Sequence, residues 1–385
     1  FNNLYLLYSS DNAFAKKPRM KFSCLTSHLN RALSFAERFA GKNITLPILG
    51  NVMLEADAAG FVIIATNLEY AIEIRVPGDV IKQGRVTVPA RVLSSLVAAI
   101  REEKVDLEVK QGNLSISSDM RQSRVNGMPP DDFPLIPKVK KTASFFVQAD
   151  LLSRSLGRAA SAISSSDFKP ELGGAFFKAH NSTLVVAATD TFRLAEETSA
   201  IAKGPVSALS CIVPQRTVQE TSRIFGEYQD EAVEISVGEN QMLARAGPVR
   251  ITSRLIEGAF PEYRAIIPAQ FGTSAFIARE EFLSAVRSSG IFVSKLQEVT
   301  LHFSRGNVEI ASANPEVGEY RTKIKANFSG TDARISFNYR YLLDGIQALD
   351  EDEMFFGCSD SSAPALMRNK SHSAFSYVVM PIRLV

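Results

Sequence analysis

Residue types that often carry out catalysis or bind metals occur in this 385-residue chain, but their spacing forms no recognisable site. His28, His180, His302 and His372 have no Cys, His or carboxylate neighbours at the spacing of metal ligands. Gly173-Gly174 is not followed by the Lys-Ser/Thr of a phosphate-binding loop, and no Gly-x-Ser-x-Gly segment marks a nucleophile elbow. We therefore expect no catalytic residues, no metal and no cofactor.

Four consecutive acids, Asp350-Glu351-Asp352-Glu353, could suggest a carboxylate cluster that holds a metal. On any regular element, however, consecutive side chains point in different directions. The sequence therefore favours a solvated loop here.

Basic residues gather on the predicted helices. Apolar periodicity predicts six helices, at residues 27–42, 89–101, 150–163, 214–225, 279–290 and 338–349. These segments hold 12 Lys and Arg but only 6 Asp and Glu, whereas the formal net charge of the chain is only +2. The bases also repeat on one face, as with Arg154 and Arg158 or Arg216 and Arg223. Surface helices can be basic by chance; the alternative is that this helical layer faces an anionic partner such as nucleic acid.

A repeat positions these helices. Short Ala-Thr or Ala-Ser segments, each after an apolar strand, begin at Ala65, Ala188 and Ala311, a constant separation of 123 residues. This period is too long for a solenoid and suits a domain-sized unit used three times. Each unit is predicted to contain two helices and several antiparallel strands, an α+β plan.

Local signals set the predicted boundaries within each unit. Ser27 and Asp150 are predicted to cap the first helices of units one and two. Gln111-Gly112-Asn113 is predicted to be the turn of a hairpin. Proline-containing segments, Pro129–Pro134 and Phe260-Pro261, end the first two units.

Bulk composition places the chain among ordinary globular proteins, with 45% apolar and 22% charged residues. Cys24, Cys211 and Cys358 are far apart and odd in number, which favours a reducing compartment, so we expect a cytoplasmic protein. No apolar run is long enough to span a membrane. Residues 1–19 lack a basic region ahead of their short apolar run and are interpreted as an N-terminal extension or an alternative start before Met20, not as a secretory signal.

Motifs along nearly the whole chain resemble those of a known family. They are Met20-Lys21-Phe22, Thr45-Leu46-Pro47-Ile48-Leu49-Gly50-Asn51, Ala65-Thr66-Asn67-Leu68-Glu69, Val88-Pro89-Ala90-Arg91, Asp132-Phe133-Pro134, Ala188-Thr189-Asp190, Phe260-Pro261-Glu262-Tyr263-Arg264 and Tyr377-Val378-Val379-Met380-Pro381-Ile382-Arg383-Leu384. In this order they resemble the bacterial DNA polymerase III beta subunit, the replicative sliding clamp.

The resemblance implies a fold and a function. It implies clamp domains at residues 20–140, 141–266 and 267–385, and a head-to-tail homodimer that closes into a six-domain ring around double-stranded DNA. Such a ring is a non-catalytic subunit that makes the polymerase processive. Its implied partners are the replicative polymerase alpha subunit, the clamp-loader delta subunit, and other polymerases and repair proteins with clamp-binding peptides. An enzyme built on triplicated domains and a clamp-like paralogue outside replication are the alternatives.

The resemblance also implies three sets of site residues. The peptide-binding pocket would comprise Leu172, Thr189, Asp190, Arg193, Leu194, Pro261, Ile266, Leu296, Asn338, Tyr341, Val378, Met380, Pro381, Ile382 and Arg383. DNA contacts are expected from Lys42, Arg91, Arg154, Arg158, Lys169, Arg216 and Arg223. The dimer interface would join Ser123, Arg124 and Val125 of one copy to Ile291 and Phe292 of the other.

Several positions depart from the family pattern. Thr191-Phe192 replaces a common Gly-His, Ala265 replaces a common base, and Val385 extends the usual terminal Leu. The loop Ser165–Glu171 is less basic than is usual. These changes affect the polar rim of the pocket and the loop's contribution to DNA contact.

Overall fold

The computed structural model describes residues 20–41, 46–204, 208–371 and 374–383. The predicted extension, residues 1–19, lies outside the described residues. Lys42 and Val385 also lie outside them, so the predictions for these two residues are not tested. The chain divides into two compact units: unit 1 is Phe1–Lys138 with Pro248–Ile251, and unit 2 is Val139–Gly247 with Thr252–Val385.

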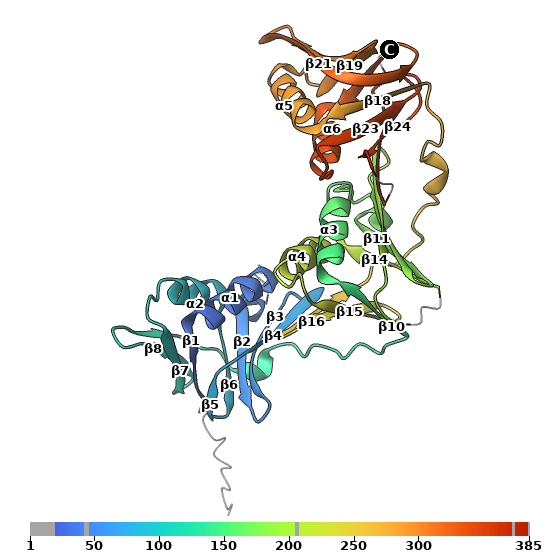
Figure 1. Cartoon of the computed structure of the whole chain (residues 1–385). Helices are drawn as coiled ribbons and strands as arrows, with labels where there is room; N and C mark the ends of the chain where they lie inside the picture. Colours follow the sequence, from blue (N-terminus) through green and yellow to red (C-terminus); the bar gives the residue numbers. More distant parts are fainter. Residues whose placement is uncertain (1–19, 42–45, 205–207, 372–373, 384–385) are drawn as a thin grey trace, which may run out of the picture. The chain divides into compact units, whose positions relative to one another are not determined.

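Unit 1 packs two helices on strands that form two sheet layers (Figure 1). Its elements are β1 (Lys21–Leu25), α1 (Thr26–Ala36), β2 (Asn51–Asp57), β3 (Gly60–Thr66), β4 (Tyr70–Val76), β5 (Asp79–Lys82), β6 (Gly84–Pro89), α2 (Ala90–Ala98), β7 (Lys104–Lys110), β8 (Asn113–Ser117) and β9 (Gln122–Val125). One sheet has the order β5-β1-β7-β8-β9, and β4, β3, β2 and β6 are neighbours in the other. The stacked rings of Phe22 and Phe61, 4.0 Å between centroids, join the two layers.

The rest of the chain repeats this plan twice. The second repeat contains β10 (Ala143–Gln148), α3 (Ala149–Ala160), β11 (Gly174–His180), β12 (Thr183–Thr189), β13 (Arg193–Ala200), β14 (Leu209–Pro214), α4 (Gln215–Phe225), β15 (Ala232–Val237), β16 (Gln241–Ala246) and β17 (Val249–Arg254). The third contains β18 (Thr273–Ala278), α5 (Arg279–Ser289), β19 (Glu298–Ser304), β20 (Asn307–Asn314), β21 (Gly318–Gly330), β22 (Ala333–Asn338), α6 (Tyr339–Gln347), β23 (Glu353–Cys358), β24 (Ala365–Asn369) and β25 (Phe375–Val379).

A twelve-stranded sheet joins the second and third repeats within unit 2. Its order is β14-β11-β12-β13-β25-β24-β23-β18-β21-β20-β19-β22. The join is the antiparallel pair β13 and β25, in which Leu194 lies opposite Val378. The C-terminal strand of the third repeat therefore completes the edge of the second.

The two helices of a repeat pack against each other. In the second repeat, Ser153 Oγ donates to the carbonyl of Ser222, and Ser222 Oγ donates to the carbonyl of Ser153, both at 2.7 Å. Figure 1 shows the resulting pair, α3 and α4, side by side. All six predicted helices are thus confirmed, with ends that differ by a few residues from the prediction.

The predicted helix caps at Ser27 and Asp150 are wrong. Both helices start earlier, after Leu25 and Gln148, because the preceding strand runs straight into the helix without a loop. The first helical N–H instead donates to the backbone carbonyl of the residue just before a neighbouring strand. This bond recurs in all three repeats: Thr26 to Glu103 at 2.8 Å, Ala149 to Glu231 at 2.9 Å and Arg279 to Asp352 at 2.8 Å.

The predicted hairpin turn is confirmed. Gln111 and Gly112 both adopt positive φ, 52° and 81°, as a two-residue turn between β7 and β8 requires. A side-chain cap occurs instead at α6, where Asn338 is the N-cap residue and its Oδ1 accepts a hydrogen bond from the Arg340 backbone N–H at 2.9 Å.

Arg158 connects the two repeats of unit 2. Its side chain is only 8% exposed and pairs with Glu197 at 2.7 Å and Asp350 at 2.8 Å. Its Nε donates to the carbonyl of Ala348 at 2.8 Å, and its guanidinium lies 4.7 Å from the ring centre of Phe375. These partners come from both repeats, so Arg158 acts as a structural bridge.

Replacing Arg158 should therefore destabilise unit 2. Arg158→Ala leaves Glu197, 3% exposed, without its closest cation, and we expect a loss of about 3 kcal/mol in a denaturation experiment. Arg154→Ala is the matched control on the same helix, because Arg154 also pairs with Glu197 but is 43% exposed. That variant should lose less than about 1 kcal/mol. Equal losses in the two variants would contradict the structural role.

Candidate peptide pocket and DNA-facing helices

The turn between β12 and β13 is held by its own side chains. Thr189 Oγ1 donates to the carbonyl of Arg193 at 2.7 Å, and Asp190 Oδ1 accepts from the backbone N–H groups of Phe192 and Arg193 at 2.9 and 3.0 Å. Thr191 has a φ of 77°, which this tight turn imposes on a residue with a Cβ. The Thr-Asp dipeptide is therefore needed for the shape of the turn.

The first repeat builds the same turn with other residues. Thr66 Oγ1 donates to the carbonyl of Tyr70 at 3.0 Å, and Asn67 Oδ1 accepts from Glu69 and Tyr70, each at 3.0 Å. Leu68 has a φ of 79°, matching Thr191. The recurrence of the strand-turn-strand unit is confirmed. In the third repeat, Asn314 Oδ1 likewise accepts from the backbone N–H of Glu316 at 3.0 Å, and its Nδ2 also donates to the carbonyl of Val293 at 2.9 Å.

Arg193, the first residue of β13, connects the turn of the second repeat to α6. Its Nε donates to Asp190 Oδ2 at 2.9 Å, and its Nη1 pairs with Asp344 on α6. Its guanidinium stacks 4.3 Å from the ring centre of Tyr341, also on α6. The turn of the second repeat is thereby fixed against a helix of the third.

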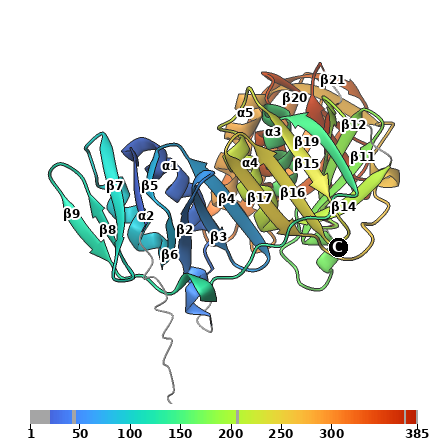
Figure 2. The same cartoon turned by 90° about the horizontal axis from the view of Figure 1, so that it is seen from below.

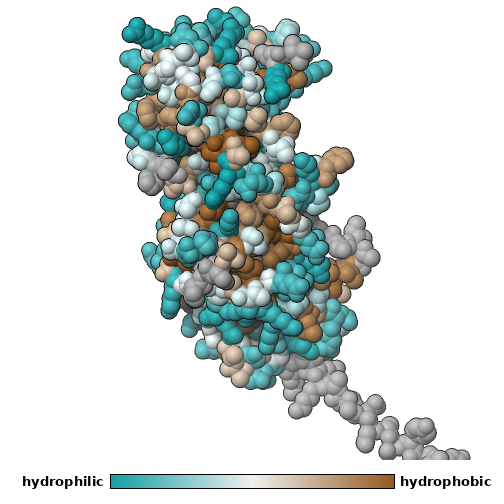
Figure 3. Space-filling model, turned by 90° about the vertical axis from the view of Figure 1, so that its right-hand side faces the viewer, coloured by the Kyte–Doolittle hydropathy of each residue, from teal (hydrophilic) through white to brown (hydrophobic). Residues whose placement is uncertain are grey.

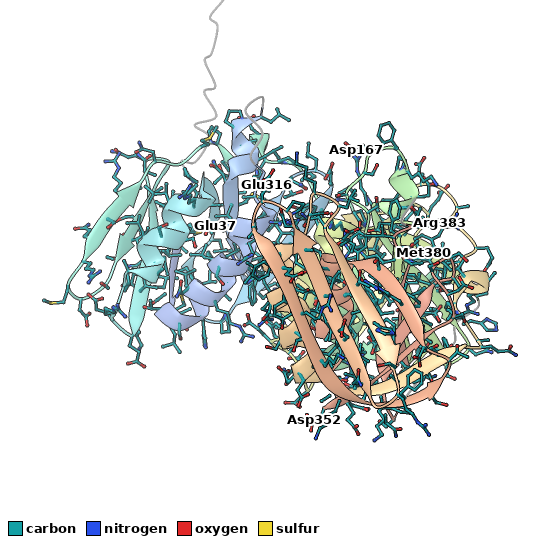
Figure 4. All side chains as sticks on the ribbon, turned by 90° about the horizontal axis from the view of Figure 1, so that it is seen from above. Glu37, Asp167, Glu316, Asp352, Met380 and Arg383 are labelled. Atoms are coloured by element: carbon teal, nitrogen blue, oxygen red, sulfur yellow. The ribbon has the colours of Figure 1, made fainter. Side chains whose placement is uncertain are left out.

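The C-terminal tail completes this arrangement. The N–H of Met380 donates to the carbonyl of Phe192 at 2.8 Å, and the N–H of Ile382 donates to the carbonyl of Ser336 at 2.8 Å. Figure 4 shows Met380 and Arg383 on this tail. Tyr377 lies beneath, and its burial raises the pKa of the phenol well above its ordinary value, so the hydroxyl stays neutral.

Two residues of the predicted apolar wall, Leu194 and Val378, are brought together but are covered. Leu172, Leu194 and Val378 are 2%, 0% and 1% exposed. Leu194 and Val378 share a cluster with Tyr263, against which Phe260 and Ile267 pack. These three covering residues belong to the segment that joins the second and third repeats. A ligand could reach the wall only beside these covering residues or after they move.

The covering segment is fixed by both aromatic and polar contacts. The ring of Phe260 stacks on Phe176 with 4.9 Å between centroids. The hydroxyl of Tyr263 donates to the carboxylate of Glu196, and Arg264 lies 3.7 Å from the same carboxylate. Burial is the main cause that raises the pKa of Tyr263, followed by this bond to Glu196. We name residues 260–267 the connecting strap.

The remaining predicted pocket residues are exposed or half-buried. Ile266 and Leu296 are 44% and 63% exposed, and Met380, Pro381 and Ile382 are half-buried. Pro261 and Arg383 are exposed, and Asn338 and Tyr341 are half-buried. Figure 3 shows apolar surface gathered in hollows on one face of the molecule. Exposed apolar groups of this kind are typical of surfaces that bind partners.

Two residues of this region could not be predicted from the sequence. Asp344 fixes the turn and Glu196 fixes the strap, but neither belongs to a motif. Asp344 is half-buried on α6, and only its polarity on a helix with an apolar stripe could have drawn attention to it. Its partner lies 151 residues away in the sequence, so the pairing itself has no local signal.

The predicted DNA-contact residues within the described part of the chain fall into two groups. Arg91, Arg154, Lys169 and Arg216 are exposed, and Arg223 is half-buried on α4. Arg158 is buried in the bridge described above, and its donors point to protein atoms, which does not suit direct contact with phosphate. Lys42 lies outside the described residues.

Buried acids orient the exposed arginines of unit 2. Glu220 is 3% exposed and lies 3.3 Å from both Arg216 and Arg223. Glu197 holds Arg154 in the same way at 3.4 Å. Burial is the main cause that raises the pKa of Glu197, whereas the adjacent arginines lower it. The acids thus fix the guanidinium groups and reduce the local positive charge.

The residues predicted to join two copies lie on free strand edges or beside them. β9 (Gln122–Val125) is the last strand of its sheet. In β21, residues 318–325 pair with β20, whereas β18 pairs only with the following residues, so among the described residues this stretch has one unpaired side. Ile291 is 68% exposed beside it, and Phe292 stacks on Tyr320 of β21 with 6.3 Å between centroids.

In the described parts of the chain, no three His, Cys, Asp or Glu side chains gather as metal ligands would. No helix in the same residues is long and apolar enough to cross a membrane. Asp350 pairs with Arg158 and Glu353 with Lys370, so these two acids of the acidic run contact bases. Burial raises the pKa of Cys24 and Cys358 to about 12, which keeps both thiols protonated.

Comparison with known proteins gives consistent matches along the chain. Models of the DNA polymerase III beta subunit match at residues 20–137 for the N-terminal domain, 146–262 for the central domain and 264–383 for the C-terminal domain. The beta sliding clamp of Synechocystis is 27% identical over 390 residues, covering 95% of this chain and all of the relative. That of Pseudomonas aeruginosa is 27% identical over 368 residues, with the same coverage.

Solved structures agree. The sliding clamp of Bacillus subtilis has a TM-score of 0.89 at 25% identity, covering 95% of this chain and all of that one. A Pseudomonas aeruginosa sliding clamp bound to griselimycin has a TM-score of 0.88 at 27% identity, with the same coverage. The chain therefore belongs to the DNA polymerase III beta subunit family, the bacterial sliding clamps.

Proposed function

We propose that two copies of this chain, each with domains at residues 20–140, 141–266 and 267–385, close head to tail into a ring around duplex DNA. As a family member the protein is a DNA sliding clamp of replication. The ring would be non-catalytic and would tether the replicative polymerase. The observation that carries this proposal is the triple repeat, whose helices bear exposed bases while its sheets bear the free edges.

The arrangement of charge suits sliding better than tight binding. A closed ring stays on DNA because of its topology, so individual phosphate contacts can be weak and exchangeable. Arg154, Arg216 and Arg223 suit this role because buried carboxylates partly neutralise them. We propose Arg91 and Lys169 as further weak contacts. Lys42 is proposed as another on the basis of the sequence alone. Reading base sequence would oppose sliding, and phosphate contacts do not require it.

Retention on DNA tests encirclement. After loading onto nicked circular DNA, the protein should remain bound through gel filtration, and cutting the circle afterwards should release it, because a ring slides off a free end. The same DNA left uncut is the control. Equal retention on the circular and the linearised molecule would refute encirclement.

Ring closure is proposed to occur through the free edges of β9 and β21. An added antiparallel strand would satisfy the unpaired backbone groups of both edges. Ile291 and Phe292 would supply apolar contact beside them, and Val125, Ser123 and Arg124 would meet them from the other copy. The two surfaces in this contact differ from each other. Such a contact closes a ring of two copies only if the rotation that relates one copy to the next allows it.

Oligomeric state tests ring closure. At micromolar concentration, light scattering should give twice the chain mass of 42.1 kDa. Ile291→Glu should shift the protein to monomer, because it places a charge in an apolar contact. Leu135→Glu, at a position 89% exposed and outside the proposed interface, is the control and should stay dimeric. A monomeric unmodified chain would contradict the proposal.

Partner proteins are proposed to bind through peptides at the rim formed by the Thr189–Leu194 turn, the tail and the strap. These partners would include the polymerase alpha subunit, the clamp-loader delta subunit, and other polymerases and repair proteins. Hydrophobic peptide anchors would contact the exposed parts of Met380, Pro381 and Ile266, and the covered wall of Leu172, Leu194 and Val378 lies below. Small apolar pockets with a few polar groups bind such anchors.

A double substitution tests this site. A peptide of the form Gln-Leu-x-Leu-Phe should bind with a Kd in the micromolar range by fluorescence anisotropy, and Met380→Ala with Pro381→Ala should abolish binding. The chain contains a second Met-Pro pair, so Met128→Ala with Pro129→Ala is a matched control. Unchanged binding by the first variant, or equal loss in both, would refute the site.

A further inference from the structure

Unit 1 contains a hollow that the proposed clamp function uses only at its β9 side, where Ser123 and Arg124 belong to the proposed dimer interface. A cavity of about 910 Å³ opens along strands β5, β7, β8 and β9. The strands that border it lie together in Figure 2. Its charged lining residues are Lys82, Glu108, Lys110 and Arg124, with Ser115 and Asn113 between them. We name this cavity the sheet hollow.

The hollow lies on the sheet face that points away from the core. Along β7, Val105, Leu107 and Val109 are buried, and Glu108 and Lys110 alternate with them. Glu108 pairs in register with Ser115 on one side and Lys21 on the other, and Ser115 pairs with Arg124. Paired residues of neighbouring strands share a face, so these side chains form one row on the outer surface.

The row is predominantly basic. Lys21, Lys82 and Arg124 form no salt bridge within the described residues, and Lys110 pairs with Glu108 at 2.8 Å. The bond to Lys110 is the main cause that lowers the pKa of Glu108, and the charges of Lys21 and Lys82 lower it further. Asp106 is the nearest other acid on this face of β7, so the bases exceed the acids around the hollow.

The neutral lining indicates which kind of anion fits. None of the residues lining the hollow is aromatic, and its two apolar ones, Met20 and Val109, are buried. An acidic peptide normally gains affinity through apolar anchors, and stacked bases need aromatic platforms. Lys, Arg, Ser, Asn and Gln are the usual partners of phosphate and sugar groups.

We propose that the sheet hollow binds the phosphate backbone of nucleic acid, independently of sequence and separately from the helices. The choice of nucleic acid rests on the proposed function, which keeps DNA close to this chain. The bases come from three different strands, so their spacing is set by the sheet and needs no folding of a loop. Such a contact would hold a strand that lies outside the ring.

Charge-neutral variants of the full chain test the hollow. We choose Lys82→Gln with Lys110→Gln because Arg124 also belongs to the proposed dimer interface. The control, Lys178→Gln with Lys203→Gln, removes the same charge from two exposed positions in unit 2. The probe is a fluorescein-labelled 15-nucleotide oligothymidine, measured by anisotropy across a salt series.

The hollow variant should bind the probe several-fold more weakly than the control variant. The slope of log affinity against log salt should fall by about 1.4, because two phosphate contacts to a single strand are lost. A probe carrying 4-thiothymidine should crosslink to peptides from β7 to β9 in the unmodified chain and lose those crosslinks in the variant. Equal affinity and equal slopes in the two variants would overturn the proposal.

Two further outcomes are informative. If polyglutamate binds more tightly than the oligonucleotide, and the variant loses only that binding, the hollow accepts acidic protein segments and the proposal is wrong. Retention on nicked circles is measured with the unmodified chain and with the hollow variant, and both should be retained. Retention of the unmodified chain together with equal oligonucleotide binding by the hollow and control variants refutes this inference alone, whereas loss of retention in the unmodified chain refutes encirclement.

Discussion

Backbone pairing between β13 and β25 is the contact on which the candidate site depends. It joins two repeats into one sheet and places Leu194 opposite Val378, although these residues are far apart in the sequence. The tail then bonds to the turn through Met380 and Phe192, and Arg193 reaches Asp344 and Tyr341 on α6. If this pairing were lost, the turn, the tail and the strap would no longer be held in fixed positions relative to one another.

The repeats show how one scaffold acquires different uses. Thr66-Asn67 and Thr189-Asp190 make the same side-chain bonds to the backbone, so both are required for the shape of their turns. What distinguishes the second copy is the residue that follows, since Arg193 has a cation–π and ion-pair partner on the next repeat and Tyr70 occupies the equivalent place in the first. Function would therefore come from the neighbours that each turn meets.

Charge in this protein is arranged in pairs. On α3 and α4 a nearly buried glutamate holds the arginines, which limits both their mobility and their net attraction for phosphate. Arg158 also pairs with a buried glutamate, but this pair stabilises the fold. Its guanidinium is buried between two repeats and has protein partners on several sides. Position along a basic helix face thus does not by itself distinguish a DNA contact from a structural bridge between repeats. The burial of the side chain does distinguish them.

The sequence alone determined the repeat, its six helices, the hairpin at Gln111-Gly112 and the family, because apolar periodicity, turn residues and motif order are local properties of the chain. It failed at the caps of Ser27 and Asp150, where backbone carbonyls from strands about 80 residues away replace a side chain. It also could not separate Arg158 from Arg154. Only tertiary structure decided these points and the cover over Leu194 and Val378, because burial and long-range pairing depend on which distant segments the fold brings together.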